Sequence, residues 1–132
     1  SDFRTMAANA QFGEIGKAFV AHYYHTFDSN RPQLSSLYKD NSLMTFENEQ
    51  FMGMQAIMTK LTTLSFQTVQ HSTTSVDCQP TSFNGIIVFV TGNLAVDGNL
   101  TTPLKFGQSF VLMPTPEGSW YVHNDMFRLN YC

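Results

Sequence analysis

The fold is decided by the stretch that closes the chain, Trp120-Tyr121-Val122-His123-Asn124-Asp125-Met126-Phe127-Arg128-Leu129-Asn130-Tyr131-Cys132. In a β-strand, alternate side chains point to opposite faces. One face would then carry Trp120, Val122, Asn124, Met126 and Arg128, and the other would carry Tyr121, His123, Asp125, Phe127, Leu129 and Tyr131. Each face holds several large apolar or aromatic groups, whereas a strand with one solvated face alternates apolar with polar residues. We therefore expect this strand to be covered on both sides.

The helical part of the chain is too short to cover two faces of a sheet. The second cover is most simply another copy of the same chain. The closing strand thus predicts a homodimer formed through the sheets.

Length and composition indicate one globular domain. The chain has 132 residues, of which 42% are hydrophobic and only 13% are charged, against about 25% charged in typical globular domains. Twelve Phe, five Tyr and one Trp favour a packed core and aromatic-lined pockets. We assign residues 11–132 to this domain and residues 1–10 to an N-terminal extension, in which residues 1–5 are expected to be a tag remnant ahead of Met6.

The charge pattern excludes several classes of function. The net charge is −3 and the seven basic residues are scattered, so no basic stripe could follow a nucleic-acid backbone. No apolar run approaches the roughly 20 residues that span a bilayer. His22 and His25 lack further ligands for a metal, and no glycine-rich phosphate loop is present, so we expect neither metal nor cofactor.

The first half of the sequence predicts helices. Apolar residues at steps of three and four indicate an amphipathic helix from Gln11 to Phe27. Asn30 is placed to cap a short second helix. A hairpin over residues 42–52 follows, and then a third helix that faces inward with Ile57, Leu61 and Leu64.

The second half predicts strands over residues 68–78, 86–91, 104–113 and 120–131, separated by turns rich in Gly, Pro, Asn and Asp. Helices first and strands later indicate an α+β domain. Such a long sheet must curl over the helices, and the curl should leave a cavity lined with aromatic side chains. The convex face, with Phe89 and Met126, should pair with a second sheet.

Several segments, in order, resemble the nuclear transport factor 2 family over about residues 11–131. They are Phe19-Val20-Ala21-His22-Tyr23-Tyr24 with Phe27-Asp28, Leu34 with Leu37-Tyr38, Met44-Thr45-Phe46-Glu47, Lys60-Leu61 with Phe66-Gln67, Gln70-His71, Gln79-Pro80 and Asn124 to Tyr131.

The resemblance implies a cone-shaped fold of helices packed in a strongly bent, mostly antiparallel sheet with a hydrophobic cavity, in a homodimer. It also implies a carrier that binds the small GTPase Ran in its GDP form and carries it into the nucleus. Such carriers contact phenylalanine-glycine repeats of nucleoporins, so the expected locations are cytoplasm, nucleus and nuclear pore. In the family, an aromatic side chain of Ran enters the cavity and acids at its rim engage lysines of Ran.

Matched by position, the resemblance makes Glu47 a rim acid, Phe46 the cavity aromatic and Asp97 the first acid of a second rim loop. The sequence departs from the family pattern at Asn99, where animal members have another acid, and the loop to Pro103 is about one residue longer. Ran binding is then weaker or relies more on Glu47.

The remaining matched positions form three groups. Phe12 occupies the place of an aromatic that contacts nucleoporin repeats. Phe89 and Met126, together with Asp125, are assigned to the dimer interface. The rest of the cavity wall is expected from Leu64, Val69, Leu94, Val96, Leu104 and Phe127.

Each of these residues also has a simpler interpretation. Phe12 fits the first core position of its helix, and Glu47 fits a solvated acid beside a turn. Asp97 in Asp-Gly-Asn is ordinary turn chemistry. His71 fits a core histidine that a neighbouring side chain satisfies.

Two rival functions stay open. The cone fold also serves isomerases and dehydratases, for which Tyr23, Tyr24, His71, Glu47 and Asp125 could supply acid–base groups. An enzyme of this kind requires an acid in the cavity with a strongly raised pKa. The other rival is a peptide-binding scaffold module, whose related domain ends in a similar His-Asn-Asp run.

Overall fold

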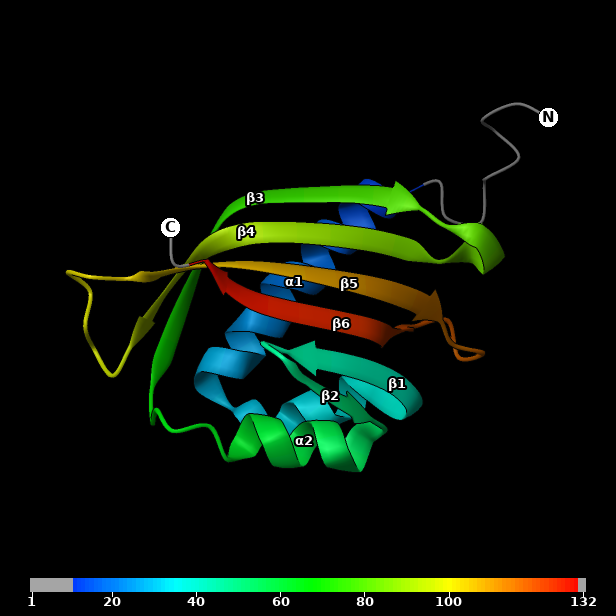
Figure 1. Ribbon diagram of the computed structural model, residues 1–132. Coiled ribbons are helices and arrows are strands. Elements are labelled where there is room, and N and C mark those ends of the chain that lie inside the picture. Colours follow the sequence, from blue (N-terminus) through cyan, green and yellow to red (C-terminus); the bar gives the residue numbers. More distant parts are fainter. Residues whose placement is uncertain (1–10, 131–132) are drawn as a thin grey trace.

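The computed structural model of the protein describes residues 11–130 and packs helices against one curled sheet (Figure 1). The expected extension over residues 1–10 lies outside the described residues, as do Tyr131 and Cys132. The elements are α1 (Phe12–Ser29), η2 (Arg31–Leu37), β1 (Tyr38–Phe46), β2 (Glu49–Met52), α2 (Met54–Thr62), β3 (Val69–Pro80), η3 (Ser82–Asn84), β4 (Ile86–Val96), β5 (Leu104–Pro114) and β6 (Trp120–Asn130).

The six strands form one sheet in the order β2-β1-β6-β5-β4-β3. Only β1 and β6 run parallel, and the other neighbours are antiparallel. The sheet bends around α1, which crosses its inner face, while α2 closes the lower end (Figure 1). The predicted α+β class with a bent, mostly antiparallel sheet is confirmed.

Helix α1 fixes the inner layer. Its apolar stripe puts Phe19, Val20, Tyr23, Tyr24 and Phe27 in the core, because residues three and four apart share one face of a helix. Burial of each such side chain contributes about 1.5–3 kcal/mol. The stripe therefore holds α1 firmly against the concave face of the sheet.

A β-bulge in β6 corrects the predicted division of its faces. Val111 of β5 pairs with Asn124, but the next residue, Leu112, pairs with Val122, so β6 contains an extra residue at this point. Strict alternation would place Val122 with Met126 on the outer face. The bulge instead turns Val122 inward, where it is fully buried on the same side as Asp125 and Phe127.

Two predicted boundaries and one predicted helix cap also differ in the structure. β1 begins at Tyr38 rather than Ser42, because its polar first half pairs with β6 across a register shift. Asn30 stands at the start of the 3₁₀ helix η2 but makes no capping side-chain hydrogen bond. α2 ends at Thr62, which leaves Leu64 in the following loop.

Gly92 in β4 allows β3 and β4 to approach where the sheet is irregular. A Cβ atom at Gly92 would stand 2.3 Å from the backbone oxygen of Ser72. The register of β3 against β4 shifts between Thr73 and Ser75 at this level. Only glycine fits beside the bulged strand.

The outer face of the sheet carries large apolar side chains that the described residues leave exposed. Along β4, Ile86, Val88 and Val90 are fully buried, whereas Phe89 is 47% exposed. Met126 on β6 is 57% exposed. The predicted second chain over this face stays a prediction, and the pattern that motivated it is present.

Candidate binding cavity

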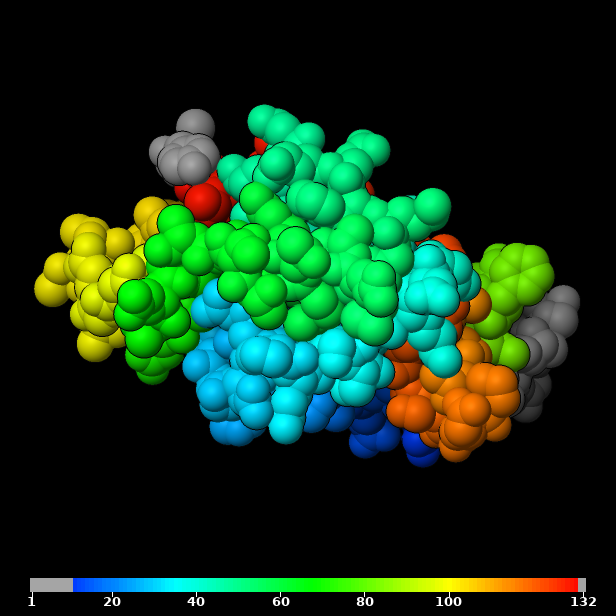
Figure 2. Space-filling view, turned by 90° about the horizontal axis from the view of Figure 1, so that it is seen from below, coloured from blue at the N-terminus to red at the C-terminus, as the bar shows by residue number. Residues whose placement is uncertain are grey.

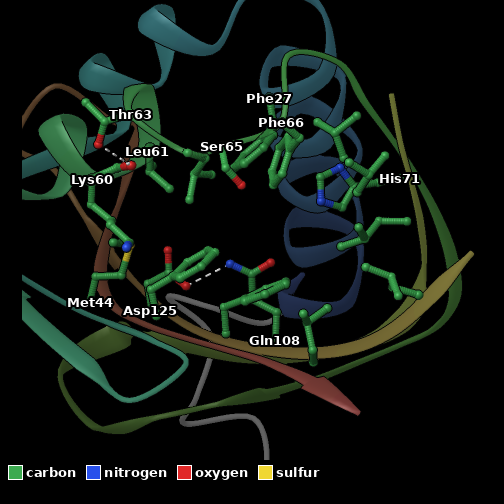
Figure 3. Close-up of a pocket in the computed structure, with 18 of the residues that line it drawn as sticks. Phe27, Met44, Lys60, Leu61, Thr63, Ser65, Phe66, His71, Gln108 and Asp125 are labelled. Carbon is green, nitrogen blue, oxygen red and sulfur yellow. Dashed lines mark hydrogen bonds between the residues drawn. The ribbon is translucent and has the colours of Figure 1, made fainter. Parts of the chain in front are cut away.

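A cavity of about 620 Å³ opens between the helices and the concave face of the sheet. Side chains from α1, α2, the loop after α2 and all strands but β2 point into this space, as the labelled residues of Figure 3 illustrate. Every residue expected in the wall lines it, namely Phe46, Leu64, Val69, Leu94, Val96, Leu104 and Phe127.

Burial separates the floor of the cavity from its mouth. At the floor, Tyr23, Leu61 and Asp125 are each 1% exposed. At the mouth, Leu104 is 40% exposed and Asp97 is exposed as well. The mouth lies beside the loop of residues 97–103, which projects from one end of the molecule in Figure 2 (yellow).

An aromatic ladder forms one wall. The Phe46 ring stacks on Phe127 with centroids 4.8 Å apart, and Phe127 stacks on Phe106 at 5.7 Å. The ammonium group of Lys60 lies over the Phe46 ring, 5.5 Å from its centroid, and pairs with Glu49 at 2.6 Å. The wall thus offers flat apolar surface with a cation beside it.

The floor carries a buried polar network centred on Asp125. Its Oδ1 accepts a hydrogen bond from Gln108 Nε2 at 2.8 Å, and its Oδ2 accepts one from the Tyr38 hydroxyl at 2.7 Å. The Tyr23 and Tyr38 hydroxyls are 2.7 Å apart, and the Tyr24 hydroxyl donates to Gln108 Oε1 at 2.6 Å. Every member therefore has a partner, as buried polar groups require.

Burial shifts the pKa values of the groups in this network. Loss of solvation raises the pKa of Asp125 to about 6, although its hydrogen bonds with Gln108 and Tyr38 act in the opposite direction. Burial, and then the charge of Asp125, raise the pKa of Tyr24 far above the range of an ordinary phenol. The carboxyl is thus the group of this cavity floor that titrates near neutrality.

His71 is a core histidine whose ring Nδ1 and backbone N–H have hydrogen-bond partners, which agrees with its simpler interpretation from sequence. Its Nδ1 lies 2.7 Å from Asp28 Oδ1, and its backbone N–H donates to Asp28 Oδ2 at 2.8 Å. Its ring stacks on Tyr24 with centroids 4.5 Å apart. Asp28 therefore fixes both the backbone and the ring of His71 at the cavity wall.

Asp97 occupies a turn, as predicted, and also lines the mouth of the cavity. Its backbone is left-handed, with φ of 52°, and its Oδ1 accepts the backbone N–H groups of Thr68 at 3.0 Å and Gln67 at 2.9 Å. These bonds, that of Thr68 first, hold the pKa of Asp97 below its usual range. The side chain joins the loop after β4 to the start of β3.

Glu47 lies beside the cavity and does not line it. It is half-buried at a left-handed turn position, with φ of 60°, and its Oε1 accepts the Leu129 N–H at 2.6 Å. The residues that the structure describes give its Oε2 no partner. The acid thus secures the end of β6 and keeps one oxygen available.

The structure corrects the assignment of Asp125 to the dimer interface. Asp125 lies on the same face of β6 as Phe127, and its hydrogen bonds to Gln108 and Tyr38 hold its carboxyl inward, at 1% exposure. Phe89 and Met126 do lie on the outer face. Phe12 begins α1 and is half-buried against the core, which agrees with its simpler interpretation and leaves part of its ring accessible.

Sequence reasoning missed Gln108, Tyr38 and Lys60 in this site. Gln108 alternates with apolar residues of β5, and an inward polar residue in such a run is a usable signal for a buried network. Tyr38 looked like a helix residue because its strand begins with polar residues. Lys60 carried no local signal, since its role depends on the hairpin of β1 and β2.

Within residues 11–130, no three His, Cys, Asp or Glu side chains gather closely enough to hold a metal ion. Among the same residues, no helix has the length and apolar character needed to cross a membrane.

A sheet curled around helices, with an apolar cavity, a polar floor and acids near its mouth, defines a cone-shaped domain with a cavity at its open end. The family model described as "Nuclear transport factor 2 (NTF2) domain" matches residues 15–129. The chain belongs to the nuclear transport factor 2 family.

Individual relatives agree with this membership and with a nuclear transport role. The chain is 53% identical over 118 residues to nuclear transport factor 2B of Arabidopsis thaliana, covering 89% of this chain and 93% of the relative. The solved structure of nuclear transport factor 2 from Cryptosporidium parvum is 52% identical, covers 92% of this chain and 97% of its own, and superposes with a TM-score of 0.88. The chain is thus a nuclear transport factor by family.

The fold is shared more widely. A putative scytalone dehydratase from Novosphingobium aromaticivorans superposes with a TM-score of 0.77 at 16% identity, over 94% of this chain and 87% of its own. At that identity the likeness concerns the fold alone. The relatives of high identity are nuclear transport factors.

Proposed function

We propose that this protein is a homodimeric carrier that binds the GDP form of the small GTPase Ran at its cavity, contacts phenylalanine-glycine repeats of nucleoporins, and mediates import of Ran into the nucleus. The observation that supports Ran binding best is the pairing of an aromatic-walled cavity with two acids that each keep an oxygen available. The protein would move between cytoplasm, nuclear pore and nucleus.

The cavity suits an inserted aromatic side chain. The stacked rings of Phe46 and Phe127 offer a flat wall, and Leu64 and Leu104 contribute apolar surface toward the mouth. Burial of one aromatic side chain there contributes about 1.5–3 kcal/mol, and the ring stacking adds about 0.5–1.5 kcal/mol.

The two acids suit lysines of the partner. Asp97 uses Oδ1 for the backbone of residues 67 and 68, and Glu47 uses Oε1 for Leu129. The other carboxylate oxygen of each acid has no partner among residues 11–130. Because their backbone is fixed, these acids present their charges without much loss of side-chain freedom. Asn99 supplies no charge, so the proposal gives Glu47 and Asp97 the main electrostatic role.

The outer face suits a dimer. Phe89 and Met126 place large apolar groups in solvent, and Ile87 extends the same surface at 40% exposure. A second sheet laid on this surface would bury them and leave each cavity mouth open. The cavity and the dimer surface would therefore use opposite faces of the sheet, while Glu47 shares a surface hollow with Phe89 and Met126 at the edge between them.

Charge substitution at Glu47 tests the proposal. Glu47→Gln keeps an oxygen for the Leu129 N–H and removes the charge, so Ran-GDP affinity should fall severalfold in a folded protein. Glu47→Lys reverses the charge and should abolish binding. Glu117→Lys, an exposed acid in the turn between β5 and β6, is the matched control and should bind normally. Full affinity of Glu47→Lys would remove Glu47 from the site.

The enzyme rival retains one supporting observation. It required a cavity acid with a raised pKa, and Asp125 is such an acid, in contact with the Tyr38 hydroxyl. However, both Asp125 oxygens accept hydrogen bonds from protein donors, and the sequence relatives are transport factors. A carrier with a structural carboxyl at its cavity floor accounts for these facts with fewer assumptions.

A further inference from the structure

The loop that joins β4 to β5 carries a threonine–proline sequence beside the mouth of the cavity. Two of the five prolines in the chain follow a threonine, in Thr102-Pro103 and in Thr115-Pro116. After Thr102-Pro103 the chain continues with Leu104 and Lys105, which places a cation three residues beyond the threonine. The loop projects from one end of the molecule (Figure 2), and Leu104, which follows it, lines the cavity. Thr102 therefore stands next to the proposed binding site.

The segment around Thr102 is accessible and weakly held. Residues 101–105 are all exposed. In the part of the chain that the structure describes, the backbone of Thr101 and Thr102 makes no hydrogen bond to another backbone group. The Thr102 hydroxyl accepts a hydrogen bond of 2.7 Å from Asn99 Nδ2, which lies in the same exposed loop. An enzyme could therefore draw this segment into its cleft without opening a helix or a strand.

The second threonine–proline sequence is held differently and serves as an internal comparison. Thr115 is half-buried, and its Oγ1 accepts the backbone N–H of Ser119 at 3.0 Å. The backbone N–H of Thr115 donates to the Ser119 oxygen at 2.8 Å, which closes the turn between β5 and β6. The third residue beyond Thr115 is Gly118, so no cation follows. An enzyme would have to break this turn to reach the hydroxyl.

Proline after a threonine has a specific chemical meaning for an enzyme that modifies the hydroxyl. Because proline has no backbone N–H, it enters an apolar pocket in which the N–H of any other residue would be buried without a partner. Kinases that select a threonine before proline use this difference. The ammonium group of Lys105 adds a point of contact for an acidic group of such an enzyme.

We propose that Thr102 is phosphorylated by a proline-directed protein kinase and that the phosphate strengthens the binding of a lysine-bearing partner at the cavity mouth. The second half of this proposal rests on the proposed binding of Ran-GDP. In the reaction, Thr102 Oγ attacks the γ-phosphorus of magnesium-bound ATP. The new O–P bond forms as the bond to the bridging oxygen breaks, ADP leaves, and the hydroxyl proton passes to a carboxylate of the kinase.

The phosphate would add negative charge where the loop has little. A phosphothreonine carries a charge of about −1.5 to −2 at pH 7 and three strong acceptor oxygens. Asp97 is the acid of this loop, and Asn99 is neutral, with an amide that already donates to Thr102 Oγ. Leu104 lines the cavity, so Lys105, the next residue of β5, faces the opposite side of the sheet. Lysines of a partner would thus meet a more negative mouth.

Phosphorylation of the whole protein tests the first half of the proposal. The protein is incubated with a cyclin-dependent kinase and magnesium-ATP, without Ran, and the phosphate is located by mass spectrometry of proteolytic fragments. One phosphate is expected, on Thr102. Thr102→Ala and Pro103→Ala should stay unmodified, the latter with its hydroxyl in place, and Thr115→Ala should be modified as wild type is. No phosphate on Thr102, equal modification of Thr115, or full modification of Pro103→Ala would overturn the proposal.

Calorimetric titration of Ran-GDP into the phosphorylated and the unmodified protein tests the second half. The phosphorylated form should bind at least about threefold more tightly, within the range of an exposed ion pair. The difference should vanish in about 1 M salt, where the screening length is about 3 Å. Equal or weaker binding of the phosphorylated form would overturn the effect at the mouth. If neither form binds Ran-GDP, the proposed function and this effect fail together, whereas the modification of Thr102 is decided by the mass spectrum alone.

Discussion

Gln108 donates a hydrogen bond of 2.8 Å to Asp125, joining the inner faces of β5 and β6 at the floor of the cavity. Phe110, not Gln108, is the residue of β5 that pairs with Asp125, so the side-chain bond runs diagonally between the strands. The same carboxyl reaches Tyr38 at the start of β1. One acid thus connects three strands of the sheet at its most buried level.

The carboxyl of Asp125 should make stability depend on pH. The pKa of Asp125 is about 6 in the folded protein and 3.8 when the chain is unfolded. As the pH rises, the carboxyl therefore ionises in the unfolded chain first. The favourable contribution of the protonated acid is complete below pH about 4 and is lost as the pH rises through 6. The loss amounts to about 3 kcal/mol of unfolding free energy.

Urea unfolding between pH 4 and pH 7 measures this effect against Asp125→Asn, whose side chain does not ionise. The difference in unfolding free energy between wild type and variant should shift by about 3 kcal/mol in favour of the variant as the pH rises. The exposed control Asp40→Asn should show no comparable shift. A difference that stays constant over this range would contradict the raised pKa.

Two substitutions at Asp97 should separate its charge from its hydrogen bonds. Asp97→Asn keeps an oxygen for the N–H groups of Thr68 and Gln67 and tolerates the left-handed backbone. Its stability should stay close to that of wild type, while Ran-GDP affinity falls up to about fivefold, the range of an exposed ion pair. Asp97→Ala loses the hydrogen bonds too and should be less stable than Asp97→Asn.

Urea unfolding and calorimetry of both Asp97 variants provide the measurements. If Asp97→Asn binds Ran-GDP as wild type does, Asp97 has only its turn function, and the rim relies on Glu47.

The outer face should hold the dimer together. Phe89→Glu places a charge in the middle of the apolar surface, and burial of an unpaired charge strongly opposes association. Light scattering at micromolar concentration should give twice the chain mass of 14.9 kDa for wild type and the single mass for the variant. Phe83→Glu, an equally radical change at an exposed phenylalanine in η3, should remain dimeric. If wild type is itself a monomer, the proposed dimer interface is wrong.

Phe12 should serve nucleoporin repeats rather than Ran. Phe12→Ala removes the accessible part of the ring, so affinity for a phenylalanine-glycine-repeat peptide should fall severalfold while Ran-GDP affinity is unchanged. Ile15→Ala is the matched control, since Ile15 is half-buried on the same helix and packs against the same core. If both variants weaken both ligands to a similar extent, Phe12 acts through folding alone.

The sequence contained most of the fold. The period of α1, the apolar strands and the order of helices before strands predicted the α+β cone, because each of these signals lies within a few residues along the chain. The bulge in β6 escaped prediction, since it depends on the register in which Val111 and Leu112 of β5 pair with β6, and side-chain alternation along β6 alone does not reveal that register. For the same reason the sequence placed Val122 on the wrong face. The assignment of Asp125 to the interface has another cause, because alternation along the strand had already put Asp125 on the face of Phe127 and opposite Met126.

The apolar wall of the candidate site was predictable, because its residues could be matched to positions in the family. All seven predicted wall residues line the cavity. The polar floor was predicted only in part, as Asp125 and Tyr23 were considered while Gln108 and Tyr38 were not. A hydrogen-bonded network is a product of tertiary contact between residues up to 102 positions apart, such as Tyr23 and Asp125, and local pattern does not encode it.

Calorimetric titration with Ran in its two nucleotide states tests the central claim most directly. The account predicts saturable binding of one Ran-GDP per cavity and at least tenfold weaker binding of Ran-GTP. Equal affinity for the two forms, or no heat with either, would contradict it.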